Sequence, residues 1–191
     1  MYLVVKCSLL VLFALAVQAE ETEECTPCAG HERAFIMLKP DALHRELCGE
    51  VINRLERKGL HLIGMKLVRA SEELAKVHYK DHENKTIFPS LIKYITSGPV
   101  VAMVWEGYDV IYQVRLMMGG HPQRVSSPHL GYLGASMKYA LPGTIRGDLV
   151  QRVDKNLIHA SDTIAAAERE ISLWFEPQEL VCWKASNCDW M

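Results

Sequence analysis

Residues 100–118 read VVAMVWEGYDVIYQVRLMM, and this stretch indicates the fold more clearly than any other part of the chain. Residues 100–105 are the most continuously apolar run, as expected for a strand buried in a sheet. Asp109 then opens a helix, because the apolar side chains that follow recur at helical spacing, at Val110, Ile111, Val114, Met117 and Met118. A buried strand that leads into an amphipathic helix predicts a domain built from both kinds of element.

The same alternation precedes this stretch. Residues 34–38 (AFIML) predict a short strand that Lys39-Pro40-Asp41 closes. A helix should follow, ended by Gly59, because apolar residues recur at Leu43, Leu47, Val51, Ile52 and Leu55. Residues 60–68 alternate well enough for a second strand. Ser71 then begins a helix, with Glu72 and Glu73 where the helix dipole favours acids.

The remaining elements follow from turn residues and periodicity. Residues 79–96 predict a short helical pair, broken by residues 84–86 and by Pro89. Residues 119–143 are irregular, and Leu157 and Ile158 belong to a fourth strand. A last helix should span about residues 163–175 and stop before Pro177. We expect its inward face to consist of Ile164, Ala167, Ile171 and Trp174.

The order of strands and helices indicates an α+β fold. It favours a ferredoxin-like sandwich, in which a four-stranded antiparallel sheet carries helices on one face. The short helical pair is an addition to that pattern. Residues 32–191 would form the one folded domain.

Composition excludes one broad class of function. The chain has 21 Lys and Arg against 23 Asp and Glu, so its formal net charge is -2. A general affinity for nucleic acid would need a basic face, which this balance does not predict.

The amino terminus differs from the rest of the chain. Residues 1–19 hold one Lys, an apolar run and a small-residue step ending at Ala19, which is typical of a secretory signal peptide or of an uncleaved membrane anchor. A polar linker, residues 20–31, contains Cys25 and Cys28. This lone C-x-x-C lacks the second ligand pair of a zinc site. Removing Cys7 with the leader would leave five of the six cysteines, a poor match to a disulfide scaffold.

His159 is the first candidate for chemistry. It ends an apolar run in NLIHASDT (156–163), where a histidine is more often structural than catalytic. A nucleophilic histidine needs one free ring nitrogen and an acceptor that holds the other. Glu170, on the following helix, could be that acceptor, and Ser161 is close enough to bond a group on the ring. Phosphates could be held by Lys39, by Arg115 and by Arg146, which lies in PGTIRGD (142–148). Each of these signals is weak alone.

Several stretches together resemble the nucleoside diphosphate kinase family. NLIHASD (156–162) is similar to its active-site signature, which commonly has Gly where this chain has Ala160. The likeness continues through ERAFIMLKPDA (32–42), SGPVVAMVWEG (97–107), PGTIRGD (142–148) and AEREISLWF (167–175). AGHER (29–33), the late Cys182-Trp183 and the apolar amino terminus are most like the type 3 members.

The resemblance implies a reaction and a set of roles. His159 would take the γ-phosphate of ATP or another nucleoside triphosphate and pass it to a nucleoside diphosphate. The resemblance implies nucleotide contacts at Lys39, Tyr79, Arg115, Arg146 and Asn156. Mg²⁺ would be the cofactor, held by phosphates and water with no protein metal ligand. The family also implies a homo-hexamer or a smaller homo-oligomer.

Two departures leave an alternative open. Ile87 stands where the family usually stacks the base on Phe. An inserted loop at about residues 120–141 adds about fourteen residues, a length that is usually functional or disordered, and lacks a phosphate-contacting Thr of the family. The alternative is a kinase-derived scaffold or membrane-tethering protein with weak or no turnover because of the insertion.

The cellular location of the protein has two interpretations. A signal peptide would lead to the secretory pathway, where Asn84-Lys85-Thr86 is a glycosylation sequon at the mouth of the nucleotide site. The type 3 resemblance instead implies the mitochondrial outer membrane. We expect an uncleaved leader, with the protein membrane-associated and the kinase domain facing the cytosol.

Overall fold

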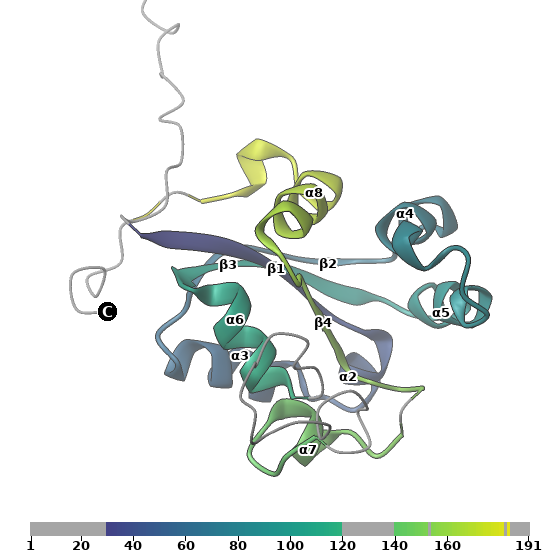
Figure 1. Cartoon of the computed structure of the whole chain (residues 1–191), viewed down its shortest axis with the longest axis horizontal. Helices are drawn as coiled ribbons and strands as arrows, with labels where there is room; N and C mark the ends of the chain where they lie inside the picture. The colour runs from purple at the N-terminus through teal and green to yellow at the C-terminus, as the bar shows by residue number, and fades with distance from the viewer. Residues whose placement is uncertain (1–29, 120–139, 153, 182, 184–191) are drawn as a thin grey trace, which may run out of the picture.

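A computed structural model describes residues 30–119, 140–152, 154–181 and 183. Four strands form one antiparallel sheet in the order β2-β3-β1-β4 (Figure 1). They are β1 (His31–Leu38), β2 (His61–Val68), β3 (Val100–Tyr108) and β4 (Ile158–Ala160). Strand β1 pairs with β3 along its whole length and with β4 at its end. The predicted ferredoxin-like arrangement is confirmed.

Helices cover both faces of the sheet (Figure 1). On one side lie α2 (Pro40–His44), α3 (Cys48–Arg57), α6 (Val110–Met118) and α7 (Ile145–Leu149). The other side carries α4 (Glu72–His78), α5 (Phe88–Ile95) and α8 (Ile164–Trp174). The expectation of helices on one face was therefore wrong. The reason is that β1 is apolar on both sides: Ile36 and Leu38 enter one core, Phe35 and Met37 the other.

Two elements differ from the prediction because a residue in left-handed backbone interrupts the expected helix or strand. The helix expected from Leu43 onward is two helices, α2 and α3, since Glu46 has a φ of 57° and interrupts it. The fourth strand begins one residue later than expected, because Leu157 has a φ of 67°. It therefore spans Ile158–Ala160 and carries His159 in its centre.

The helical pair and the last helix also differ in detail. A 3-10 turn, η1 (Lys80–His82), and a short connection separate α4 from α5. Pro89 lies in the first turn of α5, where its missing N–H breaks no helical bond, so it begins that helix and does not divide it. On α8, Ile164 is exposed and not inward-facing as predicted, while Ala167 and Trp174 are buried. A second 3-10 turn, η3 (Pro177–Glu179), follows.

Side-chain caps place the helices that carry the site. Ser71 Oγ accepts from Leu74 N at 3.1 Å at the start of α4. Thr163 Oγ1 accepts from Ala166 N at 3.1 Å at the start of α8. These caps satisfy backbone donors that a helix leaves free, and they set where each helix begins.

The leader, most of the linker and most of the inserted loop lie outside the described residues. Within the described ranges, no helix is both long enough and apolar enough to cross a membrane.

Candidate functional site

His159, Ser161 and Glu170 form one hydrogen-bonded group: Glu170 contacts the ring as the sequence indicated, whereas Ser161 bonds Glu170. Strand β4 pairs His159 with Met37 of β1, and α8 folds back so that Glu170 reaches the ring. His159 Nε2 lies 3.0 Å from Glu170 Oε1. Ser161 Oγ donates to the other carboxylate oxygen at 2.6 Å. Because the carboxylate accepts a hydrogen bond, the Nε2 atom carries the proton, and the ring's lone pair is on Nδ1.

The surroundings keep the His159 ring neutral. Burial lowers the pKa of His159 well below its usual value, and the charges of Lys39, Arg146 and Arg115 lower it further. Burial also raises the pKa of Glu170, although the hydrogen bond from Ser161 opposes this. The His159 side chain remains 20% exposed, so a ligand can reach it. A neutral imidazole with a free nitrogen is the form that acts as a nucleophile.

Lys39 lies next to the strand that carries His159. It precedes the first turn of α2, and its Nζ donates to Asn156 Oδ1 at 2.5 Å. Burial lowers the pKa of Lys39 to about 7, and the nearby Arg146 lowers it too, while Asp41 has the opposite effect. Its protonation is therefore sensitive to any anion that binds here.

Arg146 is held by the backbone around the same strand. It donates to the carbonyl oxygens of Asn156 at 3.3 Å, Gly119 at 3.3 Å and Ile158 at 2.9 Å. Burial and the neighbouring Arg115 lower the pKa of Arg146 to about 10. Arg115 itself donates to the carbonyl of Ala160 at 3.4 Å.

These three cations have no carboxylate partner in the described part of the chain. Lys39, Arg115 and Arg146 are absent from its ion pairs, although Lys39 and Arg146 are buried. Buried charges are normally paired, because removal from water is costly. The site is therefore built to receive an anion.

Tyr79 faces the histidine from the end of α4. Its ring centroid lies 5.9 Å from that of His159. Its hydroxyl is buried and has no hydrogen-bond partner among the described residues. Burial, with the charge of Glu170, raises the pKa of Tyr79, so the hydroxyl stays protonated. An unpaired buried donor beside unpaired cations indicates a hydrogen bond made to a ligand.

His78 is a neighbour that the sequence reasoning missed. Its ring lies edge-on to His159, with 4.6 Å between centroids, and its Nδ1 accepts from Trp174 Nε1 at 3.2 Å. Burial lowers the pKa of His78 to about 3. The residue is buried on a helix of ordinary composition, and nothing in its local sequence distinguishes it from a packing residue.

Few acidic oxygens in the site are available to a metal ion. Both oxygens of Glu170 are engaged. Asp41 accepts a hydrogen bond from Tyr94 through Oδ1, while its buried Oδ2 has no hydrogen-bond partner among the described residues. Asp162 is exposed, and its negative charge acts on both His159 and His82. This donor set fits a hard cation that arrives with its own phosphate and water ligands, with Asp162 as the nearby carboxylate.

The family model for nucleoside diphosphate kinase matches residues 32–180. The chain belongs to the nucleoside diphosphate kinase family. Nucleoside diphosphate kinase B of Homo sapiens is 48% identical over 163 residues, which cover 85% of this chain and 98% of that protein. Nucleoside diphosphate kinase 3 of Homo sapiens is 43% identical over 185 residues, which cover 97% of this chain and 98% of that protein. The resemblance to type 3 members is thus confirmed.

A solved kinase of the family shares the fold. The nucleoside diphosphate kinase of Halobacterium salinarum, in complex with CDP, has a TM-score of 0.74 and 46% identity, and the match covers 83% of this chain and 97% of that one. Nucleotide binding and phosphotransfer are therefore the activity of this family member.

The departure at Ile87 lies at the start of α5. Ile87 is 54% exposed and precedes the half-buried Phe88. An exposed apolar side chain between the two short helices offers contact area to a base but no aromatic face.

Proposed function

We propose that His159 is the nucleophile of a two-step phosphotransfer. The Nδ1 lone pair attacks the γ-phosphorus of a nucleoside triphosphate. The bond from phosphorus to the bridging oxygen breaks, and the diphosphate leaves with the electron pair. A terminal oxygen of a second diphosphate then attacks the phosphohistidine, and the bonding electrons return to Nδ1. Splitting the transfer lets one site serve donor and acceptor in turn.

One observation carries this proposal: a neutral, tautomer-fixed histidine lies among three cations that have no carboxylate partner in the described chain. The cations match the negative charge of a triphosphate, and the histidine is where its terminal group would meet a nucleophile. Preorganised positive charge around a transferring phosphoryl group is the main source of catalysis in such reactions.

Each neighbour has a proposed part in binding. Lys39 and Tyr79 orient the transferring phosphoryl group, Lys39 by charge and Tyr79 by its unpaired hydroxyl. Arg115 and Arg146 hold the outer phosphates. Asn156, whose side-chain carbonyl accepts from Lys39, offers its amide group to the ribose.

The family uses a divalent metal, and we propose that it is Mg²⁺. The ion neutralises charge on the nucleotide phosphates. Asp162, whose charge acts on His159, is a carboxylate that could help to hold the hydrated ion. The cationic side chains position the phosphates independently of the ion.

The alternative of an inactive scaffold gains no support from the described residues. Every charged position that the resemblance assigned to phosphate or to the nucleophile lies at the same site. We retain as proposals a homo-oligomer, up to a hexamer, and an amino-terminal membrane anchor that leaves the kinase facing the cytosol.

Incubation with ATP labelled at the γ-phosphate, with Mg²⁺, tests the mechanism. The protein should acquire label that acid removes and base does not, and a diphosphate should then take it away. His159→Asn should abolish labelling, whereas His44→Asn, at an exposed histidine on α2, should not. Normal labelling of the His159 variant would refute the nucleophile, provided that circular dichroism shows both variants folded.

A further inference from the structure

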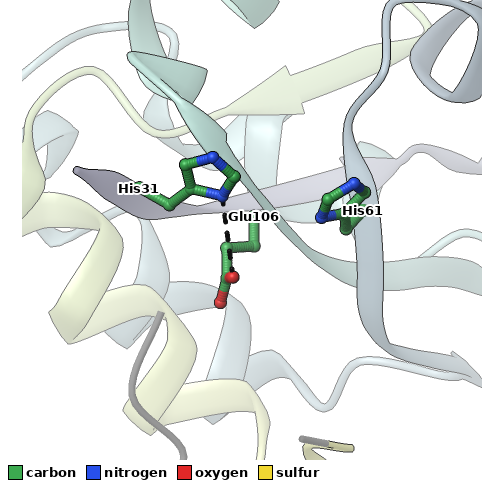
Figure 2. Close-up of side chains that lie close together, drawn as sticks. All are labelled: His31, His61 and Glu106. Atoms are coloured by element: carbon green, nitrogen blue, oxygen red, sulfur yellow. Dashed lines mark ion pairs between the residues drawn. The ribbon is translucent and has the colours of Figure 1, made fainter. Parts of the chain in front are cut away.

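A second group of ligand-type side chains lies on the sheet, away from the nucleotide site. His31 comes from β1, His61 from β2 and Glu106 from β3, and Figure 2 shows the three side chains converging. One ligand atom of each lies within 4.8 Å of the others. The phosphotransfer mechanism uses none of them.

Strand register brings these residues together. Glu106 on the central strand β3 is the direct cross-strand partner of His61 on one side and of Arg33 on the other. His31 is two residues from Arg33 on β1, so it points to the same face. That face also carries Phe35 and Met37. Met37 on β1 is the cross-strand partner of His159. His31 lies six residues before Met37, so the two residues are ~20 Å apart along the strand.

Burial and pairing distinguish this cluster from a surface group. The side chains of His31 and Glu106 are 2% and 6% exposed, and His61 is buried. His31 Nδ1 has no hydrogen-bond partner among the described residues. It lies 3.8 Å from Glu106 Oε1, which is too far for a hydrogen bond. A buried ring nitrogen without a hydrogen-bond partner, 3.8 Å from a carboxylate oxygen, is placed so that both atoms could bind the same ligand.

Arg33 fixes the orientation of the carboxylate. Its Nε donates to Glu106 Oε2 at 3.2 Å, while Oε1 is the atom nearest His31. A ligating carboxylate is typically held in this way through its other oxygen. The charge of Arg33 opposes a second cation, so affinity must come from the two imidazoles as well as from Oε1.

We propose that His31, His61 and Glu106 bind a divalent transition metal of the zinc class. Two imidazoles and one carboxylate suit Zn²⁺ or Co²⁺, whereas Mg²⁺ and Ca²⁺ prefer oxygen ligands alone. Ligands around tetrahedral Zn²⁺ are ~3.3 Å apart, from bond lengths of about 2.0 Å. The observed separation of 3.8 Å closes to that value with small side-chain movements.

The carboxy-terminal segment runs beside this site. Val181 N donates to the carbonyl of Ile63 at 2.7 Å, and Trp183 Nε1 donates to that of Leu62 at 3.2 Å. The Trp183 ring lies 5.7 Å from that of His61. A bound metal would therefore join three strands next to the point where this segment crosses β2, and should stabilise the folded state by mass action.

Zinc titration of the full chain tests the site. All proteins carry Cys25→Ser and Cys28→Ser, so that this thiol pair contributes nothing, and all are first stripped with a chelator. Binding of Zn²⁺ is measured by competition with a chromophoric chelator, the absorption of Co²⁺ reports geometry, and thermal melting is followed with and without Zn²⁺. The variants are His31→Ala and His61→Ala, with His44→Ala as the matched control.

The parent protein and the His44 variant should bind one more equivalent of Zn²⁺ than the His31 and His61 variants. Zn²⁺ should raise their melting temperature, and this rise should be lost in the two cluster variants. Labelling of His159 by ATP should persist in all of them, which verifies the fold. Equal stoichiometry and affinity across the set would overturn the proposal. So would loss of the zinc equivalent in His159→Asn, because the metal would then belong to His78, His159 and Glu170, which also converge.

Discussion

A nucleophilic histidine needs a fixed tautomer and a neutral ring, and in this chain different neighbours supply the two. Glu170 holds Nε2 through a hydrogen bond of 3.0 Å. Burial, with the charges of Lys39, Arg146 and Arg115, lowers the pKa of His159. The cations that we propose to bind phosphate thus also lower the pKa of the free ring. In the proposed mechanism, phosphate binding and the neutral state of the ring therefore depend on the same cations, while Glu170 fixes the tautomer.

Removing the Glu170 carboxylate should slow phosphorylation of His159 without abolishing it. Glu170→Ala removes a hydrogen bond to a charged group, worth ~1.5–3 kcal/mol, which corresponds to roughly 10- to 150-fold in rate. Glu168→Ala, at an exposed position on the same helix, is the control and should be neutral. Rapid-quench labelling with ATP measures both. An unchanged rate in the Glu170 variant would show that the carboxylate does not orient the ring.

Lys39 should take up a proton when a nucleotide binds. In the free protein, burial lowers the pKa of Lys39 from 10.5 to about 7. At a pH between these two values the side chain is therefore mostly neutral. A bound phosphate favours the charged form and raises this pKa, so binding at pH 8.5 draws a proton from the buffer.

Calorimetry of ADP binding in two buffers with different ionisation enthalpies measures this uptake. The binding heats should differ at pH 8.5, and the difference should shrink toward pH 6, where Lys39 is already charged. Lys39→Arg, which does not titrate in this range, serves as the control and should remove the difference. Equal heats for the unmodified protein at pH 8.5 would contradict the prediction.

At the scale of elements, short segments with left-handed residues determine the geometry of the site. Leu157, with a φ of 67°, turns the chain just before β4. Its carbonyl accepts from Lys39 N at 2.9 Å, which ties β4 to the end of β1. Thr163 then caps α8. These local features place His159 and Glu170 opposite each other, although they lie on different elements.

The α4 and α5 pair should bind a base more tightly when Ile87 becomes aromatic. Stacking on an aromatic ring is worth ~1–3 kcal/mol per base, and part of this is already supplied by the apolar Ile. We therefore expect Ile87→Phe to lower the dissociation constant for ADP by about fivefold, or ~1 kcal/mol. Met65→Phe is a matched control, because Met65 and Ile87 are both 54% exposed and Met65 lies on β2. Equal affinities in the three proteins would exclude Ile87 from the base site.

At the scale of the whole molecule, the inserted loop should govern assembly. It lies largely outside the described residues, in a segment that the family resemblance places at a subunit contact and over phosphate. Deleting about residues 124–137, which shortens the loop toward family length, should raise turnover or tighten the oligomer. A coupled kinase assay and light scattering measure these effects. A shortened protein with the same rate and mass would show the insert to be neutral.

The cellular location of the protein can be tested at one exposed residue. Asn84 lies in the exposed connection between η1 and α5, close to Ile87. With an uncleaved leader and the kinase facing the cytosol, Asn84 should carry no glycan, and membrane fractions should contain the full-length chain. Mass spectrometry of the protein from eukaryotic cells checks both. A glycan on Asn84, or a mature terminus at Glu20, would instead indicate the secretory pathway.

The sequence by itself determined the order of most elements and the candidates for the nucleophile and its acceptor. Apolar periodicity is local, so it located the four strands and most helices. The position of Glu170 on the helix after His159 was enough to pair these two residues, whereas the hydrogen bond from Ser161 to Glu170 was not foreseen. Local patterns failed where one residue in left-handed backbone, such as Glu46, interrupted a periodic segment.

Only the tertiary structure decided which distant residues meet. Lys39, Arg115 and Arg146 are far apart in the chain, and their shared lack of a carboxylate partner in the described structure emerges only when the elements pack. The same holds for His78 against His159, and for His31, His61 and Glu106, which strand register brings within 4.8 Å. Hydrophobic periodicity indicates which face of an element is buried but not which element will cover it. Pairing across the sheet, which a single sequence does not encode locally, makes that choice.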